Sequence, residues 1–227
     1  MALIYLFRLF LFPVNKKQVL LLGANGLVGS NVLSELLKSD LVGNVTVVVR
    51  KPLAISNSKL IQVVTDFSDW STLDALTTDD VLFCCIGTTR KKTPDLVQYK
   101  AIDYGITMEV ARRAKQLGCQ QIHLISSVGA NAKSSNFYLK IKGETEEGIQ
   151  SLGFKTCLIY RPSMLIGARS ESRPGEKIGQ ILTPVFDFFT FGGNYHSIRA
   201  TTLAQSMVRN ATQAPATSRI LFYKDFL

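Results

Sequence analysis

The chain has 227 residues, of which 46% are apolar and 19% are charged, and its formal net charge is +9. This length and composition predict one large globular domain and exclude a disordered chain. The positive charge would suit a phosphate-rich partner. However, the sequence has no arginine-rich block, zinc-ligand spacing or aromatic RNA-binding signature, so we expect no specific nucleic-acid partner.

The first 14 residues, MALIYLFRLFLFPV, form an apolar segment that is interrupted by Arg8 and stopped by Pro13. This segment is shorter than the roughly 20 apolar residues that cross a bilayer, and it lacks the charge order and cleavage site of a secretory signal. We expect residues 1–16 to be an apolar arm that covers the domain or a dimer surface. An interfacial membrane anchor through residues 1–14 is the less favoured alternative.

From residue 17 onward, short Val, Ile and Leu runs alternate with longer amphipathic segments. This alternation predicts an α/β fold over residues 17–227: a Rossmann-like doubly wound parallel sheet, with small substrate-side insertions after about residue 162. The expected strands are 18–22, 45–49, 60–65, 81–86, 121–126 and 155–160, with helices in the gaps, the best of them at 27–38, 94–117 and 136–151. Residues 170–177 and 189–194 have the Gly, Pro and Ser content of loops.

The first expected strand leads into LLGANGLVGSNV, which places Gly23, Gly26 and Gly29 between an apolar run and a helix. In such a pattern the first glycine permits a tight turn, the second lets the backbone approach a pyrophosphate, and the third lets the helix pack close to the sheet. The N–H groups at the start of the helix then face the phosphates. Because the pattern opens the first βαβ unit, we prefer a dinucleotide site over a purely structural turn.

The second expected strand ends in VVVRKPL, with Arg50 and Lys51 at the position that selects between NAD and NADP. A carboxylate there would bind the ribose hydroxyl of NAD, whereas a guanidinium can grip the 2′-phosphate of NADP. We therefore expect NADP; a solvated strand-end charge is the alternative for Arg50. Asp66, after the third strand, is placed either to meet the adenine or to cap the following turn.

The fourth expected strand ends at Ile86 and Gly87, where a small residue lets the chain pass beside the ribose and nicotinamide of a cofactor. Beyond it, Arg90, Lys91 and Lys92 form a basic loop. Ligands of such folds bind at the carboxyl ends of the strands, so this loop would meet an anionic substrate, although a solvated charge run is the commoner explanation.

The fifth expected strand ends in HLISSVGA, and the next helix carries Tyr138 and Lys142. Residues four apart share a helix face, and an ammonium near a phenol favours the phenolate, which makes the tyrosine a usable general acid. In carbonyl reduction Tyr138 would give a proton to the oxygen that the Ser127 hydroxyl holds, while Lys142 would also bind the nicotinamide ribose. The spacing alone occurs by chance on many helices, but the glycine pattern and the serine pair favour catalysis.

The cysteines and histidines are less informative. The four cysteines show no metal-ligand spacing, so we expect no metal site and reduced thiols in a cytoplasmic protein. The adjacent Cys84 and Cys85 are predicted to pack in a strand rather than to act as nucleophiles. His123 is expected in the core, and a place for His196 in the substrate pocket is the less favoured interpretation.

These residues resemble the short-chain dehydrogenase/reductase superfamily, in its atypical or extended branch. LLGANGLVG, FCCIGTTR, SSNFYLKIKGETE, YRPSMLIG and ESRPGE are similar to the Tat-interacting-protein oxidoreductases, which bind NADPH in a Rossmann fold. The resemblance covers almost everything from residue 17 onward. One departure is that Lys51 stands where a second arginine is common. It implies cofactor contacts at Asn25, Gly26, Leu27, Val28, Arg50, Lys51, Ile86, Gly87, Tyr138, Lys142, Leu165 and Arg173, with Tyr138 as the proton donor.

Two functions follow from this reading of the sequence. The preferred one is an NADPH-dependent oxidoreductase that transfers hydride to the carbonyl of a small molecule, with Ser127, Tyr138 and Lys142 as the catalytic residues. The alternative is an NADPH-binding regulatory protein with little or no turnover, which would use cofactor occupancy to switch contacts with a partner. Both leave room for a protein partner or a homodimer.

Overall fold

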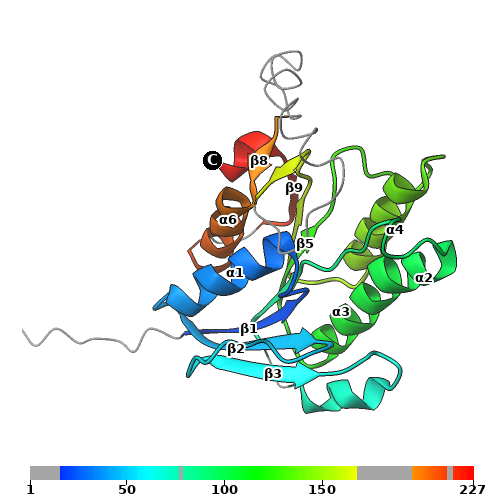
Figure 1. Cartoon of the computed structure of the whole chain (residues 1–227). Helices are drawn as coiled ribbons and strands as arrows, with labels where there is room; N and C mark the ends of the chain where they lie inside the picture. Colours follow the sequence, from blue (N-terminus) through cyan, green and yellow to red (C-terminus); the bar gives the residue numbers. More distant parts are fainter. Residues whose placement is uncertain (1–15, 77–78, 168–195, 214–216) are drawn as a thin grey trace, which may run out of the picture.

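The computed structural model describes residues 16–76, 79–167, 196–213 and 217–227. They form a seven-stranded parallel sheet with the strand order β3-β2-β1-β4-β5-β6-β9 (Figure 1). The strands are β1 (Lys17–Leu22), β2 (Val42–Val49), β3 (Leu60–Val64), β4 (Val81–Cys84), β5 (Gln121–Ile125), β6 (Thr156–Tyr160) and β9 (Arg219–Leu221). The predicted Rossmann-like α/β fold is confirmed, because the order reverses beside β1 as in doubly wound sheets.

Helices cover both faces of the sheet (Figure 1). On one face lie α1 (Leu27–Lys38) and α6 (Ala200–Thr212); on the other lie α2 (Leu96–Lys100), α3 (Thr107–Gln116) and α4 (Phe137–Ser151). The central strands β1, β4 and β6 therefore bury both of their faces, which favours apolar runs in them, whereas the edge strand β3 is partly exposed. In β1, Val19 and Leu21 pack toward α1 and α6, whereas Leu20 and Leu22 pack toward α3.

The connections before β4 differ from the prediction that helices fill every gap. Residues 50–59, between β2 and β3, contain no helix, and Pro52 and the Ser and Asn residues of this stretch favour turns over a helix. Between β3 and β4 the described residues contain one 3₁₀ helix, η1 (Trp70–Ala75). In addition, β2 begins three residues before the predicted start at residue 45, and β4 ends two residues before residue 86.

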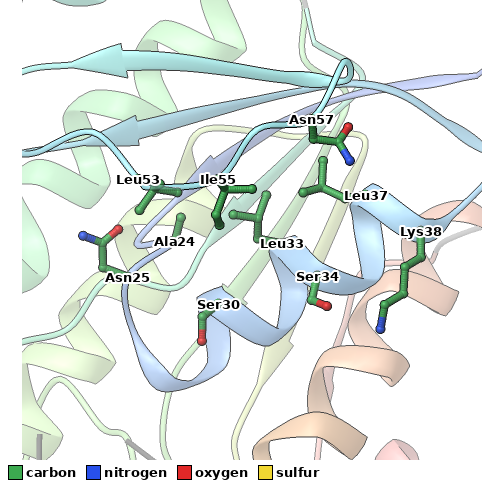
Figure 2. Close-up of a pocket in the computed structure, with 10 residues that line it drawn as sticks. All are labelled: Ala24, Asn25, Ser30, Leu33, Ser34, Leu37, Lys38, Leu53, Ile55 and Asn57. Carbon is green, nitrogen blue, oxygen red and sulfur yellow. The ribbon is translucent and has the colours of Figure 1, made fainter. Parts of the chain in front are cut away.

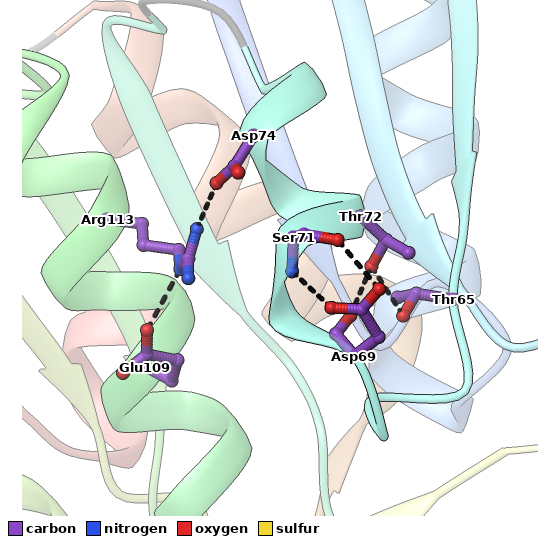
Figure 3. Close-up of polar contacts among 7 residues, drawn as sticks. All are labelled: Thr65, Asp69, Ser71, Thr72, Asp74, Glu109 and Arg113. Carbon is purple, nitrogen blue, oxygen red and sulfur yellow. Dashed lines mark hydrogen bonds and ion pairs between the residues drawn. The ribbon is translucent and has the colours of Figure 1, made fainter.

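The short helix η1 is tied to Thr65, the residue directly after β3, and to α3, as Figure 3 shows. Asp69 caps η1 by accepting a hydrogen bond from Ser71 N at 2.8 Å. Arg113 of α3 reaches Asp74 of η1 at 2.5 Å and Glu109 of its own helix at 2.9 Å. These exposed contacts hold the β3–β4 connection against the second helical layer.

The predicted helix 94–117 is a continuous helical run with an irregular middle. It starts at α2, where Asp95 caps the helix by accepting a hydrogen bond from Gln98 N at 2.7 Å. It then passes through a π-helical segment, η2 (Ala101–Ile106), before α3 ends at Gln116. Segments of π helix inside longer helices are frequent at functional sites, because the wider turn redirects a side chain.

The C-terminal part contains regular structure that the sequence analysis did not predict. A two-stranded parallel ladder joins β7 (Leu165–Ile166) to β8 (Ile198–Arg199), and after α6 the chain forms β9 and a 3₁₀ helix, η3 (Tyr223–Phe226). The predicted arm up to residue 15 and the predicted loops 170–177 and 189–194 lie outside the described residues. In the part of the chain that is described, no helix is both long and apolar enough to cross a membrane.

Candidate active site

The glycine turn after β1 has the geometry that a dinucleotide phosphate needs. Gly23 has a φ of +89°, and a Cβ there would lie 2.6 Å from the backbone of Cys85 and Ile86. A Cβ on Gly29 would lie 2.1 Å from the Gly23 carbonyl oxygen, so only glycine lets α1 start this close to the turn. Gly26 is the N-cap of α1; it has no side chain to cap the helix, and the first turn carries no acid. The N-terminal N–H groups are therefore open to an anion.

A cleft of about 960 Å³ opens at the carboxyl edge of the sheet, beside this turn. Of the predicted site residues, the following line it: Asn25, Gly26, Leu27, Val28, Ile86, Gly87, Ser127, Tyr138, Lys142 and Leu165. Residues from both halves of the fold thus meet in one cavity. Gly23 and Gly29 support the turn, while Arg173 lies outside the described residues.

Tyr138 and Lys142 lie one turn apart near the start of α4. Asn136 fixes that start, since its side-chain oxygen accepts a hydrogen bond from Leu139 N at 3.1 Å. Tyr138 is 39% exposed, whereas Lys142 is only 7% exposed, so the phenol lies at the open side of the cleft and the lysine lies deeper.

Asp103, on the π-helical segment η2, is the counter-ion of Lys142 and was missed by the sequence analysis. Its Oδ2 lies 3.4 Å from Lys142 Nζ, and its Oδ1 accepts a hydrogen bond from Thr88 N at 2.7 Å. Asp103 is 2% exposed, and burial raises the pKa of its carboxyl. A single acid inside the apolar helical stretch AIDYGIT was the signal that could have identified it, because a buried charge requires a partner.

The loop after β5 carries Ser127 and is packed tightly against α4. Asn131 N donates to the Leu139 carbonyl at 3.1 Å, and a Cβ on Gly143 would lie 2.1 Å from Ala132 N. Val128 N donates to the Pro162 carbonyl at 3.0 Å, while Ser127 Oγ donates to the Val128 carbonyl at 3.2 Å. This network fixes the serine loop relative to the helix that carries Tyr138.

One turn beyond Lys142, Glu146 makes a second buried ion pair that the sequence analysis did not predict. Arg161 donates to its carboxylate from Nε at 2.9 Å and from Nη2 at 2.5 Å, and Ser126 Oγ donates to the same group. The face of α4 that carries Tyr138 and Lys142 is therefore held by charged partners from η2 and from the end of β6.

The residues predicted to meet the adenosine half lie at the ends of β2 and β3. Arg50 and Lys51 follow β2 and are exposed. Neither is among the described residues that line the cleft. The strand that they follow pairs with β1, which leads into the glycine turn. Asp66 accepts hydrogen bonds from Ser68 N at 2.8 Å and Ser68 Oγ at 2.6 Å, which lowers the pKa of its carboxyl. Asp66 thus caps the turn, which is the second of the two roles predicted for it.

Beside the cleft, a second hollow of about 500 Å³ lies between α1 and the segment after β2 (Figure 2). Leu33 and Leu37 of α1 face Leu53 and Ile55 across it, so its lining is mainly apolar. Asn25 lines both spaces. None of the predicted catalytic residues lines this hollow.

The histidines and cysteines have structural surroundings. His123 is buried and lies 2.9 Å from the Tyr160 hydroxyl, and burial lowers the pKa of His123 to about 3; its predicted place in the core is confirmed. The ring of His196 packs against that of Tyr223 with 5.1 Å between centroids. His196 is not among the described residues that line the cleft. Cys85 does line it, but burial raises the pKa of the thiol to about 12, so it stays protonated.

Comparisons with known proteins agree with this geometry. A profile of the family described as NAD(P)H-binding matches residues 23–169. Protein HTATIP2 from Rattus norvegicus is 37% identical over 169 residues, which cover 73% of this chain and 69% of that protein. Protein fmp52, mitochondrial, from Aspergillus clavatus is 41% identical over 165 residues, with 70% of each chain covered. The match to HTATIP2 confirms the predicted similarity to the Tat-interacting-protein oxidoreductases.

Solved structures share the fold at low sequence identity. MoeE5 in complex with UDP-glucose and NAD has a TM-score of 0.67 at 17% identity, over 90% of this chain and 75% of that one. The ADP-L-glycero-D-manno-heptose-6-epimerase from Helicobacter pylori has a TM-score of 0.68 at 16% identity, over 92% and 78%. At this identity the likeness shows the Rossmann-type fold alone.

The names of the fungal relatives correct one prediction. Proteins from Aspergillus clavatus and Candida albicans that cover 70% and 71% of this chain are both named mitochondrial. The prediction of a cytoplasmic protein is therefore wrong. It rested on the expectation of reduced cysteines, and reduced thiols do not distinguish one intracellular compartment from another.

Proposed function

The chain belongs to the NAD(P)H-binding family, and from this premise we propose that it is an NADPH-dependent oxidoreductase that reduces the carbonyl group of a small molecule. One observation carries the proposal: Tyr138, Lys142 and Ser127 line the same cleft as the uncapped N-terminus of α1. A phosphate-binding helix end and a proton-donating phenol in one cavity are the two parts that hydride transfer to a carbonyl requires.

The residues of the cleft fit the cofactor. The N–H groups of Leu27 and Val28 at the start of α1 would hold the pyrophosphate. At Gly87 a Cβ would lie 3.7 Å from Asp103 Oδ2 and 3.8 Å from Lys142 Nζ, so the missing side chain leaves space beside the ammonium. That space suits the nicotinamide ribose, whose hydroxyls Lys142 would bind. When bound, the nicotinamide supplies the hydride.

The choice of NADP over NAD rests on the end of β2. Arg50 and Lys51 are exposed there, directly after the strand that pairs with β1. A guanidinium can bind a phosphate bidentately, and the adjacent ammonium adds attraction. The 2′-phosphate distinguishes NADPH from NADH, so these two cations favour NADPH.

The chain's own residues would then carry the proton chemistry. The Ser127 hydroxyl would donate a hydrogen bond to the carbonyl oxygen, and the Tyr138 hydroxyl would give its proton to that oxygen as the carbon receives the hydride. The Lys142 ammonium would stabilise the phenolate that remains, and Asp103 keeps that ammonium in place. The product is the alcohol.

The test is NADPH oxidation with a panel of aldehydes, ketones and quinones. In Tyr138→Phe we expect kcat to fall by about 100-fold or more, with NADPH affinity within about threefold of wild type, because only the proton donor is removed. Tyr104→Phe is the matched control, since Tyr104 lies on η2 but does not line the cleft as described, and it should retain full activity.

The same experiment separates the two functions. Equal kcat values for Tyr138→Phe and wild type would refute the catalytic role of the phenol. Tight NADPH binding without turnover of any compound in the panel would instead favour an NADPH-binding regulatory protein.

A further inference from the structure

A cationic turn forms one wall of the cleft. Residues 89–93 fold back on themselves, since Lys92 N donates to the Thr89 carbonyl at 2.9 Å and Thr93 N donates to the same oxygen at 2.8 Å. Arg90 and Lys91 are exposed within this turn, and both line the cleft. We call residues 89–93 the basic turn.

The basic turn is fixed to the elements that carry the candidate catalytic residues. Arg90 Nη1 donates to the Pro94 carbonyl at 2.7 Å, and its guanidinium lies 6.0 Å from the ring centre of Phe137, the residue before Tyr138. Just before the turn, Thr88 Oγ1 is hydrogen-bonded to Thr93 Oγ1 at 2.8 Å. A freely solvated charge run would have no such supports, so the turn and its Arg90 guanidinium are held in position at the cleft.

The charges around the cleft are unbalanced. Its described lining contains the cations Arg90, Lys91, Lys92 and Lys142 but only one carboxylate, Asp103. That carboxylate lies beside Lys142, so Arg90 and Lys91 of the basic turn add positive charge to the described lining. A concave site lined by one sign of charge attracts ligands of the other sign.

We propose that the basic turn binds an anionic group, a carboxylate or a phosphate, on the substrate, so that the preferred substrates are carbonyl compounds with a negatively charged end. This inference rests on the proposed carbonyl reduction and names its substrate class. The pyrophosphate of the cofactor is the other possible source of the anion. It has a separate place at the uncapped N-terminus of α1, formed by Gly26 and the residues that follow.

The experiment compares para-carboxybenzaldehyde with its methyl ester, which differs mainly in lacking the charge. Wild type should have a kcat/KM for the acid about tenfold or more above that for the ester, and added salt should reduce this ratio. Lys91→Gln should reduce the ratio about three- to fivefold, as expected for the loss of one partly exposed charge, without a change in the Kd for NADPH. Lys155→Gln makes the same substitution at an exposed residue just before β6 and should leave the ratio unchanged.

Two outcomes would overturn the proposal. The first is equal kcat/KM values of wild type for the acid and the ester. The second is weaker NADPH binding by Lys91→Gln with the ratio as in wild type, which would assign the basic turn to the cofactor.

Failure of the proposed reduction is distinguished by a binding measurement. If neither aldehyde is turned over, para-(hydroxymethyl)benzoate and its methyl ester are titrated calorimetrically into the chain saturated with NADP⁺. Tighter binding of the acid, lost in Lys91→Gln and kept in Lys155→Gln, would support the anion site without catalysis. Equal or absent binding of the two would refute it.

Discussion

At the scale of single residues, the ion pair between Lys142 and Asp103 has the clearest consequence. The buried carboxylate lies 3.4 Å from the ammonium and itself accepts a hydrogen bond from Thr88 N. Asp103 is a positioning residue, because it acts on the substrate only through Lys142.

In Asp103→Asn we expect kcat to fall about 10- to 100-fold, because the ammonium loses the charge that positions it. KM for the carbonyl substrate should change much less, since no substrate contact is removed. Steady-state kinetics with saturating NADPH separates the two quantities. A variant with unchanged kcat would contradict the positioning role, and Asp74→Asn, an exposed acid on η1, serves as the control.

Arg50 decides the proposed cofactor preference. In Arg50→Gln we expect the Kd for NADPH to rise about tenfold while the Kd for NADH stays within about twofold, because only NADPH carries the phosphate. Fluorescence titration of both nucleotides measures this. Equal losses of affinity for both would show that Arg50 contacts a part that they share.

Sequence alone predicted that Tyr138, Lys142 and Ser127 lie at one site, since helix spacing and strand-end position are local properties; the three line one cleft, and their catalytic role stays a prediction. It missed Asp103 and Glu146, because their roles depend on contacts with Lys142 and Arg161 that only the folded chain creates. Asp66 was assigned two possible roles, and only the hydrogen bonds to Ser68 reveal that it caps its turn.

At the scale of elements, the contact between α4 and the loop after β5 sets the distance between the serine and the tyrosine. Gly143 is the contact point, where a Cβ would lie 2.1 Å from Ala132 N and 2.2 Å from the Asn131 carbonyl carbon. Both neighbours are backbone atoms, which cannot turn away as a side chain can.

Gly143→Ala should therefore destabilise the fold by about 1–3 kcal/mol and lower kcat, because α4 must move away from the serine loop. Gly105→Ala is the matched control: a Cβ there meets nothing within 4 Å. That variant should be unchanged or stabilised by up to about 1 kcal/mol, since alanine favours a helix over glycine. Thermal unfolding and kcat report both effects, and equal behaviour of the two variants would contradict the close packing.

The elements that were predicted correctly are those with strong periodic signals, such as β1, α1 and α4. β9 consists of three residues, Arg219–Leu221, and its pairing with β6 is a long-range contact that local pattern does not show. The π-helical segment inside the predicted helix 94–117 was also not predicted. It contains Asp103, whose burial depends on contacts that exist only in the folded chain.

At the scale of the whole molecule, a buried carboxyl lowers stability at neutral pH. Asp79, just before β4, is 3% exposed, and its Oδ2 has no hydrogen-bond partner among the described residues. Burial, with a contribution from Asp80, raises the pKa of Asp79 from 3.8 to about 6. The folded chain therefore binds this proton more tightly than the unfolded chain does, and protonation stabilises the fold.

Asp79→Asn should raise the free energy of unfolding at about pH 7.5 by up to about 3 kcal/mol, the equivalent of two pKa units. The gain over wild type should shrink as the pH falls through about 6 toward 4, where the wild-type carboxyl becomes neutral. Urea unfolding at several pH values measures this gain in the free energy of unfolding. The difference between variant and wild type removes the contribution of other titrating groups, such as His123. A gain independent of pH would contradict the raised pKa; exposed Asp40→Asn should have little effect.

For the whole molecule, we propose that NADPH lies across the carboxyl edge of the sheet, with its pyrophosphate at α1 and its nicotinamide beside Tyr138. A crystal structure of the chain with NADPH tests this most directly. We predict the pyrophosphate on the N–H groups that follow Gly26, the ribose within hydrogen-bond distance of Lys142 Nζ, and the nicotinamide facing the Tyr138 hydroxyl. A nucleotide bound elsewhere, or a nicotinamide turned away from that hydroxyl, would contradict the account.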